Sequence, residues 1–315
     1  MRGKKFTAAV VQAAAPAFDK KAALEKFADL AGQAAGKGAE IAVFPEAFIG
    51  GYPKGLDFGA RVGSRTPEGH EDFLRYWNGA VALAGDDLAA LSGIVRKAGI
   101  YIALGLIEQG GGTLYCSVAF FAPDGTYMGK HRKVMPTAAE RLVWGYGDGS
   151  TLPVYDTPLG KLGAVICWEN MMPAMRLAMY GKGIEIYCAP TVDDRDTWHA
   201  SMRHIAREGR CFVLNATQFA TRADYPADYE NIHGDDPATV MINGGSCIVS
   251  PFGEVLAGPT YGEEIILTAE IDMDELPRAK YEFDPVGHYA RPDIFELRVD
   301  ERAKEPVTQV TGDEA

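Results

Sequence analysis

The chain has 315 residues, and its 31 basic and 43 acidic side chains give a formal net charge of −12. Hydrophobic residues make up 47% and charged residues 23%, which excludes a largely disordered chain. An acidic protein without a cluster of basic residues is a poor candidate for binding nucleic acid or an anionic membrane. No apolar run reaches the ~18 residues of a membrane span, and no signal peptide follows the basic start.

The first half of the chain predicts strands that alternate with helices. Apolar runs bounded by turn residues indicate strands, and apolar residues at helical spacing indicate helices. A polar, glycine-rich stretch at 49–70 separates two of these segments. We expect strands at 6–12, 41–44, 101–107, 114–121 and 126–134, and helical segments at 20–35 and across 71–98.

The second half repeats the alternation. It predicts an α/β fold with helices covering both outer faces. Because no linker or repeat is visible, we expect one domain over 1–299, followed by a charged, mobile tail at 300–315. Strands are expected at 162–166, 184–189, 211–217, 246–250, near 255 and at 265–271, helices at 173–180 and 197–208, and a hairpin turn at 251–254.

The cysteines indicate a reducing environment. There are five of them, widely spaced and without a C-x-x-C pattern. Such usage suits the cytoplasm, where one thiol can be chemical and the rest structural. We therefore expect a cytoplasmic protein. The five positions are 116, 167, 188, 211 and 247.

Three strand ends carry unusual residues, and strand ends are where α/β proteins place reactive groups. Glu46 follows the apolar run IAVFP, Lys133 ends the basic run KHRK, and Cys167 follows LGAVI. Each also has a structural interpretation. A cysteine in this context is usually a small buried hydrophobe, a glutamate after proline is often a turn or cap residue, and a basic run is mostly a solvated face.

Together these three residues fit one chemistry. A cysteine nucleophile needs a base, a carboxylate in an apolar pocket can serve as that base, and a nearby lysine can stabilise an anionic intermediate. Cys–His alternatives are weaker, because none of the six histidines has a pattern that assigns it to a thiol.

Metal and nucleotide sites are not indicated. His199 and His204 are five residues apart and do not share a helix face, and no H-E-x-x-H occurs. The glycine-rich run at 145–150 lacks the G-K-[ST] ending of a phosphate loop, so we interpret it as an ordinary loop.

Segments around these three residues are recognisable. FPEAFIGGYPKG around Glu46, GKHRKVMPTAAERLVWGYGDGS around Lys133 and GAVICWENMMPAMR around Cys167 resemble the three signature segments of the nitrilase superfamily, most closely its true nitrilase branch. Further similarity covers 183–198, 242–259 and 286–293, so the resemblance spans about residues 6 to 298.

The resemblance implies an active site and an architecture. It implies Glu46 as general base, Lys133 as cationic stabiliser and proton donor, Cys167 as nucleophile and Glu140 as an additional carboxylate that positions substrate or water. The implied fold is a single-domain α-β-β-α four-layer sandwich that dimerises into an eight-layer assembly, without a metal or organic cofactor. Long filaments are less expected, because the chain stops soon after GHYARPD.

The implied activity is hydrolysis of an arylaliphatic or aliphatic nitrile to a carboxylic acid and ammonia. The backbone N–H of Trp168 is a candidate for stabilising developing charge. An amidase or nitrile-hydrating activity on the same scaffold, or a non-catalytic assembly protein, are the alternatives. Candidates for lining the substrate pocket, each of which could equally be a packing or loop residue, are Tyr52, Thr137, Trp168, Met171 and His199.

Overall fold

The first of two β-sheets is built mainly from the N-terminal half of the chain. The computed structural model describes residues 3–229, 232–305 and 307. The sheet has the strand order β13-β1-β2-β3-β4-β5, in which β1, β2 and β3 are parallel and the other pairs are antiparallel. Its strands are β1 (Lys5–Gln12), β2 (Ile41–Val43), β3 (Tyr101–Gly110), β4 (Thr113–Phe121), β5 (Tyr127–Arg132) and β13 (Ile265–Asp272).

The second sheet has a similar parallel centre. Its order is β10-β11-β9-β8-β7-β6, with β12 paired to β11, and β7, β8 and β9 run parallel. Its strands are β6 (Val154–Thr157), β7 (Gly160–Ala164), β8 (Ile186–Cys188), β9 (Phe212–Asn215), β10 (Phe219–Thr221), β11 (Val240–Val249) and β12 (Val255–Tyr261).

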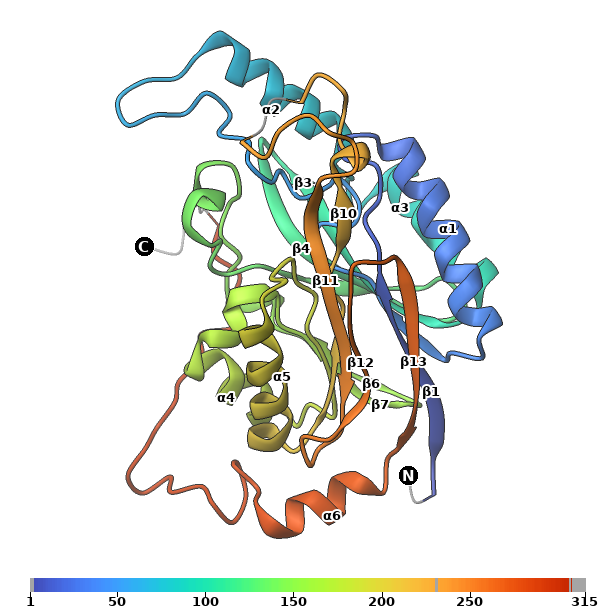
Figure 1. Ribbon diagram of the computed structural model, residues 1–315. Helices are drawn as coiled ribbons and strands as arrows, with labels where there is room; N and C mark the ends of the chain where they lie inside the picture. The colour runs from blue at the N-terminus through green and yellow to red at the C-terminus, as the bar shows by residue number, and fades with distance from the viewer. Residues whose placement is uncertain (1–2, 230–231, 306, 308–315) are drawn as a thin grey trace.

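Helices cover the outer face of each sheet, as Figure 1 shows. Helices α1 (Lys20–Gly36) and α3 (Gly85–Ala98) pack on the first sheet, and α4 (Pro173–Gly181) and α5 (Asp196–Gly209) pack on the second. The expected α-β-β-α sandwich is therefore confirmed, whereas its dimerisation stays a prediction. The remaining helices are α2 (Pro67–Gly79), α6 (Glu275–Glu282) and the 3₁₀ turns η1 (Ala138–Leu142), η2 (Gly149–Thr151), η3 (Cys167–Met171) and η4 (Arg222–Asp224).

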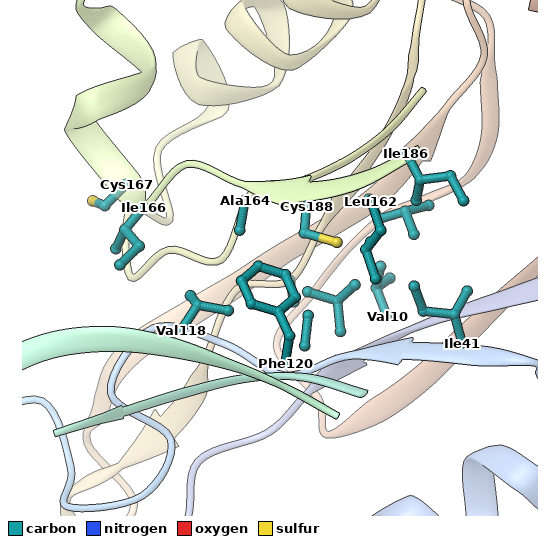
Figure 2. Close-up of a cluster of buried hydrophobic side chains, with 14 of the residues drawn as sticks. Val10, Ile41, Val118, Phe120, Leu162, Ala164, Ile166, Cys167, Ile186 and Cys188 are labelled. Carbon is teal, nitrogen blue, oxygen red and sulfur yellow. The ribbon is translucent and has the colours of Figure 1, made fainter. Parts of the chain in front are cut away.

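A continuous apolar core fills the space between the sheets. Figure 2 shows Val118 and Phe120 of the first sheet facing Ala164 and Cys188 of the second. Cys167 lies at the edge of this cluster, and its sulfur points away from the other side chains drawn. The core therefore holds the two sheets together directly beside the turn that carries Cys167.

The predicted helical stretch across 71–98 was wrong as a single segment, because it contains two helices. Gly79 packs so tightly that an added Cβ would lie 2.7 Å from the Cα of Phe18. Two residues later, Val81 donates a backbone hydrogen bond of 3.0 Å to Ile107 at the edge of β3. Pairing with a strand thus interrupts a locally favourable helical pattern.

Short elements were also not predicted, namely β6, β10 and α6. The hairpin turn at 251–254 is confirmed, since Ser250 donates to the carbonyl of Glu254 at 2.8 Å and joins β11 to β12. Among the described residues, no helix is long and apolar enough to cross a membrane.

The start of the predicted tail contacts the body of the protein. Glu301 forms an ion pair of 2.7 Å with Lys182, and the backbone N–H of Lys304 donates to Asp148 at 2.7 Å. Residue 306 and residues 308–315 lie outside the described residues. The domain boundary at 299 and the tail's mobility stay predictions.

We expect Phe120→Ala to lower the free energy of unfolding by about 3–5 kcal/mol, because it would leave a cavity between the two sheets. Phe120 is fully buried and contacts Tyr155 edge-on, with ring centroids 5.2 Å apart. Denaturant unfolding followed by circular dichroism measures the change. Leu74→Ala on exposed α2 is the control and should change it by less than about 0.5 kcal/mol. Equal effects of the two substitutions would contradict this view of the core.

Candidate active site

The three residues at strand ends converge between the sheets. Glu46 follows β2, Lys133 follows β5 and Cys167 opens η3 shortly after β7. The ammonium of Lys133 donates to Glu46 Oε1 and to Glu140 Oε2, each at 2.7 Å. The side chains of Lys133 and Glu46 are fully buried, and that of Glu140 nearly so. A buried cation thus sits between two carboxylates.

The two oxygens of Glu46 are in different situations. Oε1 accepts from Lys133 and, at 3.5 Å, from the thiol of Cys116. Oε2 is buried without a hydrogen-bond partner among the described residues. The side-chain amide of Gln218 donates to the Glu46 carbonyl at 2.7 Å and fixes the backbone. Oε2 is therefore the oxygen available to take a proton.

Burial raises the pKa of Glu46, and the charge of Lys133 opposes this effect while that of Glu140 adds to it. For Lys133, burial alone would lower the pKa, but Glu46, Cys167, Cys116 and Glu140 together raise it well above the ordinary value. The indole ring of Trp144 also lies 5.3 Å from the ammonium, within cation–π range. Lys133 is therefore held as a cation.

Cys167 occupies a strained turn. Its φ of 48° lies in the left-handed region, which a residue with a Cβ adopts only where its surroundings enforce it. The backbone N–H of Cys167 donates to the Pro190 carbonyl at 2.9 Å, and its carbonyl accepts from the Asn170 amide at 2.8 Å. The hydroxyl of Thr191 donates to Sγ at 3.2 Å.

The Cys167 thiol keeps its proton in the resting site. Burial raises its pKa, the charge of Glu46 adds to this rise, and the charge of Lys133 opposes it. A thiolate therefore forms only as the proton moves to a neighbouring base. Chemically, the arrangement can transfer a proton from sulfur to a carboxylate and stabilise a developing negative charge beside a fixed ammonium.

Glu140 is held by three donors. Besides Lys133, it accepts from the backbone N–H of Thr137 at 2.6 Å and from the hydroxyl of Tyr52 at 3.0 Å. Two of the predicted pocket residues thus act on the carboxylate directly.

A cavity of about 620 Å³ opens onto this cluster. Trp168 stands at its wall with 43% of its surface exposed, and its indole N–H donates to Asp193 at 2.8 Å. The Arg195 guanidinium lies over the Trp168 ring at 5.1 Å. Cavity-lining residues include the predicted Tyr52, Thr137, Glu140, Cys167 and Trp168, and also Leu56, Leu142, Val192, Asp193 and Arg195.

Two predicted residues do not join this set. His199 lies on α5 and, like Met171, is not among the residues that line the cavity. The glycine-rich run at 145–150 is a loop that leads into η2, and in this loop Gly147 donates to the Lys133 carbonyl at 2.8 Å and packs against Arg132. Among the described residues, no three His, Cys, Asp or Glu side chains are grouped so as to hold a metal ion.

A family model described as carbon-nitrogen hydrolase matches residues 7–281. The chain belongs to the carbon-nitrogen hydrolase family. It is 58% identical over 303 residues to an aliphatic nitrilase of Sinorhizobium fredii, covering 96% of this chain and 98% of the relative. It is 54% identical to a nitrilase of Bradyrhizobium diazoefficiens (99% and 97%) and 53% identical to a bifunctional nitrilase/nitrile hydratase of Nicotiana tabacum (96% and 88%). These relatives place this hydrolase in the nitrilase branch.

Solved structures agree with the fold. A carbon-nitrogen hydrolase of Helicobacter pylori superimposes with a TM-score of 0.72 at 24% identity, covering 92% of this hydrolase and 97% of that chain. An amidase from Nesterenkonia superimposes with a TM-score of 0.65 at 20% identity, covering 90% and 97%.

Sequence reasoning missed several residues of this hydrolase that surround the reactive groups. Thr191 follows β8 as Cys167 follows β7, and these strands are parallel neighbours, so the same strand-end argument could have found it. Cys116 and Gln218 contact Glu46 across 70 and 172 residues of sequence. No local pattern marks either of them.

We expect Lys133→Met to lower the free energy of unfolding by about 3–5 kcal/mol near neutral pH, because it would leave two buried carboxylates without their cation. Burial raises the pKa of Glu46, and losing the cation removes the charge that opposes this rise, so Glu46 takes up a proton as the pH falls. The deficit relative to wild type should therefore shrink at acidic pH. Denaturant unfolding at several pH values measures it.

Lys5→Met is the matched control. Lys5 forms an exposed ion pair of 2.7 Å with Glu270, and such pairs contribute little to stability. We expect almost no effect at any pH. A Lys133→Met deficit that does not change with pH would contradict the predicted protonation of Glu46.

Proposed function

We propose that this hydrolase is a nitrilase that converts an arylaliphatic or aliphatic nitrile and two waters into a carboxylic acid and ammonia. Cys167 is the nucleophile, Glu46 the general base, and Lys133 the stabilising cation and proton donor. The observation that carries the proposal is the buried Lys133 ammonium between Glu46 and Glu140. Beside it lie a thiol and Glu46 Oε2, which has no hydrogen-bond partner within the part of the chain that the structure describes. The names of its relatives support nitriles as the substrate class.

The first step forms a covalent thioimidate. Glu46 Oε2 takes the thiol proton while sulfur bonds to the nitrile carbon, and one π electron pair of the C≡N bond moves to nitrogen. The nitrogen takes a proton from Lys133, which regains one from the Glu46 carboxyl. A polarisable sulfur suits this neutral, linear carbon, because addition requires no leaving group.

Two waters complete the reaction. Glu46 removes a proton from the first water as the water oxygen bonds to the thioimidate carbon, and this proton passes through Lys133 to the nitrogen. The new hydroxyl then gives its proton through Glu46 to the nitrogen as the C=O bond forms and the C–N bond breaks, so ammonia leaves and a thioester remains. Glu46 takes a proton from the second water as the water oxygen bonds to the thioester carbon. The carbon–sulfur bond breaks, the sulfur takes this proton back from Glu46, and the acid departs. Glu140 orients substrate or water through the oxygens that Tyr52 and Thr137 hold.

Two hydrogen-bond donors stabilise the negative charge that develops on the substrate during the reaction. One is the ammonium of Lys133, and the other is the backbone N–H of Trp168. Trp168 lies in the first turn of η3, where backbone N–H groups have no partner within the helix.

The tetrahedral intermediate can also lose the thiol before ammonia, which would release an amide. Amide formation by this route, or hydrolysis of amides, is the alternative activity of the same site. The name of the tobacco relative, which includes nitrile hydratase, favours testing for it. A non-catalytic assembly role is a weaker candidate, because such a role needs neither the ion pair nor the thiol.

The substrate occupies the cavity beside Cys167. Tyr52, Thr137 and Trp168 contact the substrate there.

The cellular compartment and the oligomeric state are also part of this proposal. All five cysteines are free, which supports a cytoplasmic setting. Exposed Tyr281 and Phe295 in the C-terminal region support a homodimer or larger homo-oligomer, in which such apolar surface is covered.

We expect wild type to release acid and ammonia from members of a panel of aliphatic and arylaliphatic nitriles, and Cys167→Ala and Glu46→Gln to have no measurable turnover. Products are measured by chromatography and an ammonia assay. Cys211→Ala is the matched control, because Cys211 is a buried thiol among the outer helices, away from the cavity. It should keep wild-type turnover.

Other outcomes assign the alternatives. Amide as the main product would mean that the thiol leaves first, and turnover of amides alone would make the protein an amidase. Full activity of Cys167→Ala would refute the nucleophile assignment. A correctly folded wild type without turnover of either class would favour the non-catalytic role.

A further inference from the structure

Glu169, two residues after Cys167, accepts three hydrogen bonds although it is almost completely buried. Its Oε1 accepts from the backbone N–H of Val134 at 2.6 Å. Its Oε2 accepts from the backbone N–H of Ile166 at 2.9 Å and from His131 Nε2 at 2.8 Å. The mechanism above uses neither Glu169 nor His131.

The two backbone donors are the neighbours of the reactive residues. Val134 directly follows Lys133, and Ile166 directly precedes Cys167. One carboxylate therefore links the end of β5 to the turn of η3, that is, the segment of the ammonium to the segment of the nucleophile. A displacement of either segment would stretch at least one of these hydrogen bonds.

The surroundings of His131 determine its protonation. Its Nδ1 lies 2.6 Å from the carbonyl oxygen of Thr151, which can only accept, so Nδ1 carries a proton. Its Nε2 faces Glu169 Oε2, and both oxygens of Glu169 already accept from backbone N–H groups, as the oxygens of an acceptor-only carboxylate do. Nε2 must then donate as well. A ring that donates from both nitrogens is an imidazolium.

The electrostatics agree with this geometry. Burial lowers the pKa of His131, but the charge and hydrogen bond of Glu169 and the Thr151 carbonyl outweigh it, so the net change is a rise. Besides Thr151 on η2 and Glu169 on η3, Tyr187 of β8 interacts with the same carboxylate. Burial, with a smaller contribution from the charge of Glu169, raises the pKa of Tyr187 well above its usual value, so Tyr187 stays neutral. His131 and Glu169 thus form a buried pair without net charge.

We propose that His131 and Glu169 are positioning residues, an ion pair that fixes the distance between Lys133 and Cys167, with His131 doubly protonated in the working enzyme. This rests on the proposed function only for its catalytic consequence. Misplacing either reactive group should slow the reaction, since small displacements at a reacting centre can cost about 100-fold in rate.

The protonation is tested first on the unaltered protein. Two-dimensional NMR of ¹⁵N-histidine-labelled wild type near neutral pH identifies which ring nitrogens carry protons, and His131→Gln assigns the signal. We expect both nitrogens of His131 to be protonated. The exposed His204, which lies 3.6 Å from Glu208, is the internal comparison because its side chain is open to solvent. One unprotonated nitrogen on His131 would overturn the proposal.

The positioning role is tested with Glu169→Gln and His131→Gln. We expect kcat to fall by about 10- to 100-fold with KM changed less than about threefold, and alkylation of Cys167 by iodoacetamide to slow. The control His204→Gln should match wild type in every assay. Wild-type kcat in folded variants would overturn the positioning role, even if their melting temperatures fall.

Two further results, variants that do not fold and a wild type without turnover, can be told apart from a failure of the positioning role. If neither variant folds, the positioning role is tested by the pH at which wild-type kcat falls on the alkaline side. This fall should coincide with the deprotonation of His131 followed by NMR, and a kcat that does not change as His131 loses its proton would overturn the role. If wild type turns over no nitrile or amide, the proposed function fails, while the NMR result and the iodoacetamide rates still decide whether the pair is charged and positions the thiol.

Discussion

The buried ion pair between Lys133 and two carboxylates is the constraint on which the rest of the site depends. Removing three charged groups from water is costly, and the cost is offset only when the groups meet at close range with their hydrogen bonds satisfied. The 2.7 Å contacts of Lys133 with Glu46 and Glu140 meet that condition. They therefore require the ends of β2 and β5 and the turn η1 to meet in one place.

The four-layer architecture supplies that meeting point. Each sheet has a parallel centre, and the apolar contacts between the sheets hold the turn of Cys167 against the strands of the first sheet (Figure 2). The strained backbone of Cys167 is maintained by hydrogen bonds to the Pro190 carbonyl and from the Asn170 amide. Rigid packing thus places a thiol beside Lys133 and Glu46, which lie 34 and 121 residues away in sequence.

Sequence reasoning located Glu46, Lys133 and Cys167, because Glu46 and Cys167 follow apolar strands, Lys133 ends a strand-like basic run, and strand ends are recognisable from local pattern. It also predicted the α/β layering, since alternating strands and helices leave few other arrangements. It missed contacts that depend on long-range geometry, such as the thiol of Cys116 on Glu46. The stretch across 71–98 was misread for a similar reason, because pairing of Val81 with the edge of β3 interrupts it and no local pattern encodes that pairing.

The charges around the thiol have a consequence for how the reaction ends. Glu46 and Glu140 outnumber Lys133, so with a protonated Cys167 these groups carry a net charge of about −1, and the His131–Glu169 pair adds nothing to it. An uncharged nitrile enters without electrostatic penalty. A newly formed carboxylate is repelled by the groups that made it. The same excess of negative charge, which adds to the effect of burial in keeping sulfur protonated, would thus speed departure of the acid and weaken inhibition by product.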